Sequence, residues 1–180
     1  MKVYAFLAEG FETVEALGVI DILRRGKVDV VTVSIMKDRM VTTSHGVPVM
    51  ADKLFEECDF SDGDALFLPG GLPGTDNLEV HEGLSRLIDR YYEEGKYLTA
   101  ICAAPRILGH HNILQGKKAT CFPEYIEDLY GATVTGNGVE KDGKIITGRG
   151  MGKTVDMGLL MLAEFTNQET SDLIKKKIQY

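Results

Sequence analysis

Short apolar runs alternate along the chain with longer segments in which apolar residues recur at helical spacing. The runs are KVYAFLA at residues 2–8, VDVVTVSI at 28–35, DALFLPGG at 64–71 and KYLTAI at 96–101. Strands this apolar are buried on both faces, which is typical of parallel sheets and not of half-exposed antiparallel ones. The pattern therefore predicts four buried strands, the third of which ends in a glycine turn.

Helical segments follow these runs. After the first run, apolar residues recur at helical spacing and a glycine stands where the helix would end: Val14, Leu17, Ile20, Leu23 and Gly26. Residues 81–94 predict a second helix. The C-terminal segment predicts two more, one carrying Val155, Leu159, Leu162 and Phe165 and one beginning near residue 167. This order predicts an α/β fold with a doubly wound, mainly parallel sheet and helices on both faces.

Two segments have a different pattern. Residues 40–52, MVTTSHGVPVMAD, contain two extended runs around His45 and Gly46, which predicts a small hairpin on the sheet edge. Residues 132–150 alternate extended runs with Asn-Gly and Asp-Gly turns at residues 137–138 and 142–143. No internal repeat, linker or low-complexity stretch interrupts the chain, so we expect a single domain over residues 1–180.

Composition limits the function classes. The chain has 180 residues, 44% of them hydrophobic, which suits one core. Its net charge of -7 disfavours nucleic acid, and the basic run IKKK at residues 174–177 is typical of a solvated helix end. No apolar run approaches the ~20 residues that cross a bilayer, and Glu9 stands where a signal peptide would stay apolar. We expect a cytoplasmic protein without nucleic-acid or membrane partners.

The chain has three cysteines, Cys58, Cys102 and Cys121, without CxxC spacing or a nearby histidine. We therefore expect no disulfide framework, no metal site and no cofactor. Cys58 and Cys121 have no special setting and are interpreted as structural residues. Cys102 differs, because it directly follows the apolar run at residues 96–101.

Cys102 stands where a predicted strand turns sharply into a helix. Two small alanines follow it, and Pro105 suits the first helical position. This is the pattern of a nucleophile elbow, in which helix amides would lower the pKa of the thiol and receive a developing oxyanion. An isolated cysteine is more often a small buried hydrophobe. The position of Cys102 favours the reactive interpretation.

The carboxyl ends of the other strands supply partners, because ligands bind there in open α/β sheets. Glu15 lies one turn into the first helix, where burial would raise its pKa and the protonated carboxyl could orient the sulfur. Glu9 and Glu12 are interpreted as solvated residues at the helix N-terminus. Gly70 and Gly71 offer backbone amides to a ligand oxygen, although a connector without ligand contact fits their spacing equally well.

Four motifs in this order, LAEGFETVEALGVIDILRR, LFLPGG, AICAAP and DGKIITGRGMGKTVDMGLLML, resemble the ThiJ/PfpI superfamily, in the branch of the Parkinson-disease-associated protein deglycase. The resemblance covers nearly the whole chain. It implies a flavodoxin-like sandwich, of the class I glutamine-amidotransferase type, and a homodimer. It also implies an oxidation-sensitive cysteine at Cys102, a protonated glutamate at Glu15, pocket glycines at Gly70 and Gly71, and a pocket arginine at Arg149.

One departure from the family concerns the pocket. Several members have a histidine in a THP triplet twenty residues after the cysteine, whereas this chain has CFP with Phe122 in that place. A phenyl ring cannot move protons, so a histidine base and a protease-type Cys-His pair are disfavoured. By alignment, His45 lies near the expected dimer face, either as a pocket residue or as an interface residue.

Two hypotheses follow from the resemblance. In the first, Cys102 adds to a small 2-oxoaldehyde or glycated substrate, Glu15 relays protons, and the amides of Gly70, Gly71 and Ala103 hold the oxyanion, as in a cofactor-free glyoxalase or deglycase with slow turnover. In the second, the same cysteine is an oxidation switch of a redox-sensing or chaperone-like stress protein.

Overall fold

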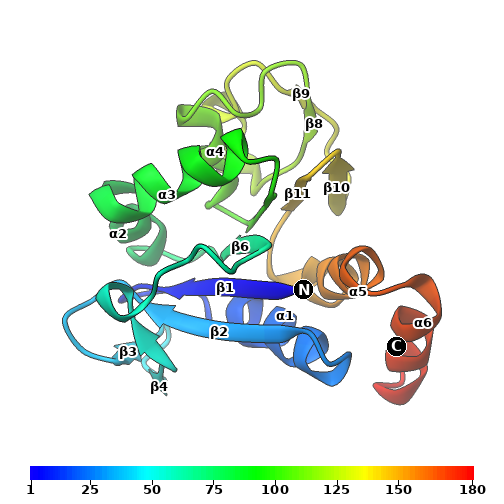
Figure 1. The fold of residues 1–180 in the computed structure, drawn as a ribbon. Coiled ribbons are helices and arrows are strands. Elements are labelled where there is room, and N and C mark those ends of the chain that lie inside the picture. The colour runs from blue at the N-terminus through cyan, green and yellow to red at the C-terminus, as the bar shows by residue number, and fades with distance from the viewer.

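The computed structural model describes all residues 1–180 and is built around a seven-stranded sheet (Figure 1). The strand order is β10-β11-β7-β6-β1-β2-β5, and every neighbouring pair is parallel except β10 and β11. The strands are β1 Lys2–Leu7, β2 Asp29–Ser34, β5 Lys53–Leu54, β6 Ala65–Leu68, β7 Tyr97–Ile101, β10 Val139–Asp142 and β11 Ile145–Gly148. The four predicted strands and the mainly parallel sheet are confirmed.

Helices cover both faces of this sheet. One face carries α1 Thr13–Arg25, α5 Thr154–Phe165 and α6 Gln168–Lys177; the other carries α2 Gly74–Val80, α3 Glu82–Glu93 and α4 Pro105–His110. Two hydrophobic clusters, of 24 and 23 buried residues, fill the two interfaces. Because each face of the sheet has its own core, the strands β6 and β7 are buried at every position, as their apolar runs predict.

The hairpin at residues 40–52 forms, but not on the sheet edge. Its strands β3 Met40–Thr42 and β4 Pro48–Met50 pair only with each other, and the edge is taken by β5 beside β2. The hairpin is attached instead to the loop after β1: the Gly10 amide donates to the Thr42 carbonyl and the Ser44 amide to the Phe11 carbonyl, each at 2.8 Å. This attachment places the hairpin tip beside the ends of the central strands.

The segment at residues 132–150 also differs in part from the prediction. The Asp142-Gly143 turn joins the antiparallel pair β10 and β11, as predicted. The Asn137-Gly138 turn does not close a hairpin, because β9 Thr133–Val134 pairs in parallel with β8 Lys118–Ala119. Three short 3-10 helices complete the chain: η1 Phe55–Glu57, η2 Pro123–Asp128 and η3 Met151–Lys153.

Helix α1 is rotated relative to the face that the apolar spacing predicts. Val14 is 48% exposed, whereas Glu15 is only 1% exposed and points into the protein. The reason is that α1 packs against the sheet and also against α5, so its buried face is broad and includes Val19 and Ile22. A carboxyl group is thereby carried into the core.

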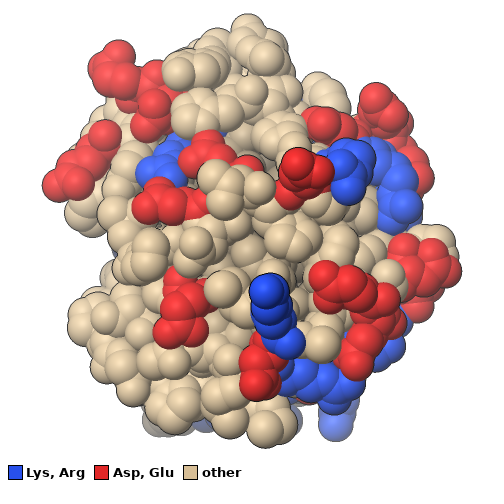
Figure 2. Space-filling view, turned by 90° about the vertical axis from the view of Figure 1, so that its left-hand side faces the viewer, with Lys and Arg blue, Asp and Glu red and all other residues tan.

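The parallel strands all end at one side of the molecule. From β1 the sheet is extended by β2 on one side and by β6 and β7 on the other, so the order of the strands reverses between β1 and β6. Loops from both halves of the sheet meet at such a switch point. Seen from this side, Lys and Arg side chains are interspersed with Asp and Glu and form no continuous basic surface (Figure 2). No helix in the protein combines the length and the apolar character needed to span a membrane.

Candidate active site

Cys102 occupies a strained corner directly after β7. Its φ is +65°, in the left-handed region that residues with a side chain adopt at a cost of about 1–2 kcal/mol. The Cys102 amide donates to the Gly148 carbonyl at 2.9 Å, and α4 begins at Pro105, the predicted first helical residue. The predicted sharp turn from strand to helix is therefore present, and the thiol is half-buried.

Glu15 lies against this thiol. Its carboxylate accepts a hydrogen bond from the Gly70 amide at 3.1 Å, and the Cys102 thiol and the Met151 amide lie near enough to act as further donors. Burial, together with the nearby charge of Glu12, raises the pKa of Glu15 to about 7, although these hydrogen bonds act in the opposite direction. The prediction that Glu15 is buried beside the cysteine with a raised pKa is confirmed.

The expected thiolate is not what the structure favours. Burial, followed by the charge and the hydrogen bond of Glu15, raises the pKa of Cys102 to about 12. The amides of Ala103 and Gly71 lower it, as predicted, but their effect is smaller. The prediction of an ionised cysteine was wrong because it counted the helix amides and left out the removal of the sulfur from water. These shifts favour a neutral thiol at rest beside a carboxyl group whose pKa is about 7.

The two glycines after β6 have different roles. The Gly71 amide faces the Cys102 thiol and lowers its pKa, while the Gly70 amide donates to Glu15. Gly71 has a φ of +90°, and a Cβ there would collide with the Glu12 amide. At Gly70, a Cβ would lie 2.5 Å from Glu15 Oε2 and 2.6 Å from Cys102 Cβ. Only glycines allow this close approach, so both are needed for packing at the corner, and their contact with a ligand stays a prediction.

A cavity of about 280 Å³ opens onto the thiol. Its lining comprises Glu12, Ser44, His45, Gly71, Leu72, Cys102, Ala103, Phe122, Glu124 and Tyr125. Phe122 is thus a pocket residue, as predicted. Arg149 is not: it lines a neighbouring cavity of about 430 Å³, shared with Phe122 and Met151, and its Nη1 donates to the Gly136 carbonyl at 3.4 Å.

Sequence reasoning missed Tyr125 and left the place of His45 open. The hairpin attachment brings His45 to the cavity, where its Nδ1 lies 3.0 Å from Ser44 Oγ. Tyr125 reaches the cavity from η2, and the Arg106 guanidinium lies 5.1 Å from its ring centroid. In the sequence, the Ser44-His45 pair in a predicted turn could have indicated a pocket position for His45. Nothing in the sequence indicated one for Tyr125, because η2 has an irregular backbone.

The remaining acidic and cysteine residues have structural roles. Glu12 Oε2 caps α1 by accepting the Glu15 amide at 2.6 Å, and Glu9 Oε2 accepts the Thr42 amide at 3.0 Å, so neither is simply solvated as expected. Cys121 is buried, Cys58 is half-buried, and neither lines the cavity. No group of three or more His, Cys, Asp or Glu side chains is arranged to hold a metal ion.

The protein is thus of the α/β class, with a doubly wound sheet in which a half-buried thiol at a strained strand end lies beside a buried glutamate. The family comparison agrees: residues 1–164 match the DJ-1/PfpI family, and the chain belongs to this family. The predicted superfamily, its DJ-1 branch and the flavodoxin-like fold are thereby confirmed.

Individual relatives support the same assignment. The chain is 38% identical to the protein DJ-1 homolog B of Arabidopsis thaliana over 170 residues, which are 93% of this chain and 39% of the plant protein. It is 31% identical to a deglycase of Pyrococcus abyssi over 134 residues, 74% of this chain and 80% of the relative. The structure of oxidized Toxoplasma gondii DJ-1 superposes with a TM-score of 0.95 at 30% identity, covering 99% and 98% of the two chains.

The chain spans about two fifths of the length of the Arabidopsis relatives that it matches.

Proposed function

We propose that the chain is a cofactor-free, cysteine-dependent enzyme that converts small 2-oxoaldehydes into hydroxy acids without glutathione. One observation carries the proposal: the Cys102 thiol lies beside the Glu15 carboxyl, whose pKa is raised to about 7, and Cys102 lines an open cavity together with Gly71 and Ala103. The resemblance to a deglycase of Pyrococcus abyssi supports chemistry on aldehyde-derived groups.

The first step is addition of sulfur to the aldehyde carbon. Because the thiol is neutral at rest, the ionised Glu15 carboxylate takes its proton as the carbon–sulfur bond forms. The carbonyl oxygen becomes an oxyanion beside the amides of Ala103 and Gly71. These amides can now donate to the oxyanion, because the sulfur is bonded to carbon. The proton held by Glu15 then neutralises the oxyanion, giving a hemithioacetal.

The second step moves a proton between adjacent carbons. The hydrogen on the hemithioacetal carbon leaves as a proton, the neighbouring carbonyl becomes an enediol, and reprotonation gives a 2-hydroxy thioester. Water then releases the hydroxy acid and the thiol, so that methylglyoxal and water give lactate with no external oxidant. His45 lines the same cavity as Phe122 and supplies a side chain that can carry a proton, which a phenyl ring cannot do.

Adducts of 2-oxoaldehydes on larger molecules are a second substrate class for this site. The cavity adjoins the larger Phe122 and Arg149 cavity, so a reacting carbon attached to a bulky group has room beside the thiol. Cys102 would attack the same carbon in a deglycase reaction, and the amine or thiol of the adduct would be the leaving group.

Lactate production from methylglyoxal tests this proposal, measured enzymatically with purified full-length protein and no added thiol. Wild type is expected to give slow but saturable turnover, and both Cys102→Ser and Glu15→Gln are expected to lose at least about 100-fold in kcat/KM. Cys58→Ser is the matched control and keeps its rate, because Cys58 lies outside the cavity. Turnover that survives Cys102→Ser would reject the role given to the thiol.

The same cysteine also supports a redox-sensing, chaperone-like stress function. The Toxoplasma gondii relative is described in an oxidized form, and here Glu15 stands where it could donate to an oxidised sulfur. The raised pKa of the Cys102 thiol acts against rapid oxidation, since the thiolate is the species that reacts. Intact-mass analysis after mild peroxide separates the two roles: oxygen added at Cys58 or Cys121 but not at Cys102 would exclude the sensor.

A homodimer is part of the proposal. Exposed apolar side chains surround the mouth of the site, with Leu72 48%, Phe122 40% and Met151 54% exposed. Association of two copies would remove such surface from water. Light scattering at several concentrations decides whether the chain is a dimer in solution.

A further inference from the structure

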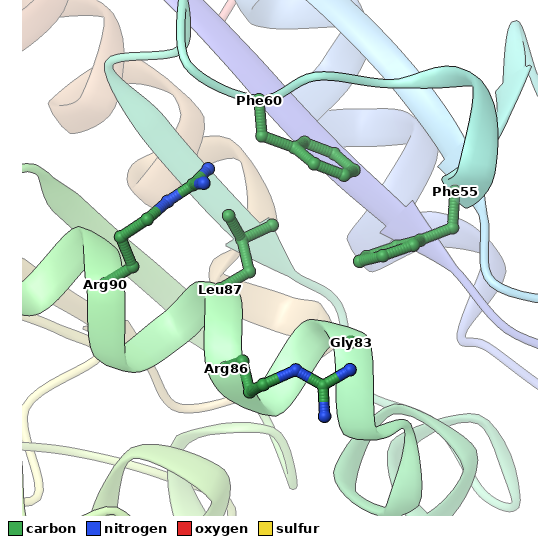
Figure 3. A pocket seen from close by; sticks show the side chains of 6 residues that line it. All are labelled: Phe55, Phe60, Gly83, Arg86, Leu87 and Arg90. Carbon is green, nitrogen blue, oxygen red and sulfur yellow. The ribbon is translucent and has the colours of Figure 1, made fainter.

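A second cavity lies between α3 and the segment of residues 55–60. It has a volume of about 290 Å³, and its six lining residues are Phe55, Phe60, Gly83, Arg86, Leu87 and Arg90 (Figure 3). None of them lines the cavity at Cys102. The volume is at the lower end of the range that small-molecule sites occupy.

One wall of this cavity is aromatic and held in place. The rings of Phe55 and Phe60 lie 4.8 Å apart at 45°, and Leu87 points toward them from α3 (Figure 3). Phe60 adopts a left-handed φ of +64°, and the Tyr91 hydroxyl donates to its carbonyl at 2.7 Å. A Cβ on Gly83 would lie 2.8 Å from the Phe55 ring, so glycine is what lets this ring approach the helix. The two rings are therefore held in fixed positions.

The other wall carries two guanidinium groups whose ion pairs within the protein are weak. Arg86 and Arg90 stand one turn apart on α3 and flank Leu87 (Figure 3). Their ion pairs with Glu82 and Glu94 are long, at 3.5 and 3.9 Å, and exposed to solvent. Three other surface arginines approach a carboxylate oxygen within 2.6–2.8 Å: Arg24, Arg25 and Arg39.

We infer that this cavity binds a small aromatic carboxylate. The ligand ring packs mainly against the half-buried Phe55 and meets only the edges of Phe60 and Leu87, which are 4% and 5% exposed. Its carboxylate accepts hydrogen bonds from the planar guanidinium of Arg90, and Arg86 adds charge from the next turn. The two arginines favour an anion locally although the whole chain carries a net charge of -7. A cavity of this size admits one ring and a short acid side chain, and excludes a nucleic-acid strand.

The test uses 3-phenylpropionate as the probe and two-dimensional amide NMR of the full-length protein. Saturable shifts are expected at residues 55–60 and 83–90, and Arg90→Gln is expected to weaken binding at least fivefold. The double variant Arg86→Gln/Arg90→Gln is expected to show no saturable binding. Arg25→Gln is the matched control with unchanged affinity, because Arg25 lies on α1.

A neutral probe of the same shape, 3-phenylpropanamide, separates the charge from the ring and is expected to bind at least fivefold more weakly. All three arginines are surface residues, and the amide spectrum itself reports whether each variant is folded. Equal affinity for the acid and the amide would overturn the proposal. So would shifts confined to residues near Cys102, or the absence of saturable shifts at 50-fold excess of probe.

Discussion

Replacing Glu15 by glutamine is expected to change how the stability of the protein depends on pH. Burial raises the pKa of Glu15 from 4.5 to about 7, so the folded chain holds this proton more tightly than the unfolded chain does. The stabilisation is fully present below pH 4.5 and is lost as pH rises through 7. At 1.36 kcal/mol per pKa unit, wild type loses about 2 to 3 kcal/mol from this group between pH 5 and 8.

The glutamine variant has no proton to lose at this position. Its side chain has an NH2 group in place of one carboxyl oxygen, so an amide that donates to that oxygen loses its acceptor. This costs about 1–2 kcal/mol relative to the protonated wild type, and the cost itself does not depend on pH. The difference in unfolding free energy between variant and wild type is therefore expected to shift by about 2 to 3 kcal/mol in favour of the variant between pH 5 and 8.

Urea unfolding followed by circular dichroism at pH 5, 6, 7 and 8, at constant ionic strength, measures this shift. Glu93→Gln, a change at an exposed glutamate, is the control and should run parallel to wild type. A constant difference between Glu15→Gln and wild type across this pH range would refute the reasoning, since it would mean that folding does not perturb the titration of Glu15.

Three further outcomes follow from the site. Alkylation of Cys102 by iodoacetamide, monitored by mass spectrometry, should have the midpoint of its pH dependence above the free-thiol value of ~8.5, because burial and Glu15 raise the pKa of this thiol. Glu15→Gln should lower that midpoint, and a wild-type midpoint below ~8.5 contradicts the expectation. His45→Gln should lower kcat for methylglyoxal by at least about tenfold while the hemithioacetal still forms, as seen by trapping and mass; an unchanged kcat removes His45 from proton transfer. Gly71→Ala should lower the free energy of unfolding in urea by clearly more than the ~1 kcal/mol expected for Gly46→Ala. Both glycines have a positive φ, but only at Gly71 would the added Cβ collide with backbone atoms. Equal losses would argue against tight packing at Gly71.

The sequence predicted the sheet better than the site. Buried parallel strands are apolar throughout, and this property is local, so the four runs at residues 2–8, 28–35, 64–71 and 96–101 all became strands of the sheet. Strand β5 was missed because it has only two residues, and helix α2 because Gly74 and Pro73 at its start resemble a loop.

The site depended on information that is not local. The corner at Cys102 and the glycines were predictable from small residues at strand ends. The pKa of the thiol was not, because it depends on how deeply the sulfur is buried and on the distance to Glu15, which the packing of α1 against α5 decides. The position of His45 depended on which loop the hairpin joins, a contact between residues more than thirty positions apart.

The left-handed backbone at Cys102 lowers the stability of the fold at the same residue that carries the thiol. Glycine would relax that corner by about 1 kcal/mol, yet it would remove the sulfur. Directed evolution for heat resistance alone should therefore replace this residue, whereas selection that also requires the proposed aldehyde conversion should keep it. The corner thus offers a direct way to ask, in a growing population, whether the thiol is of use to the cell.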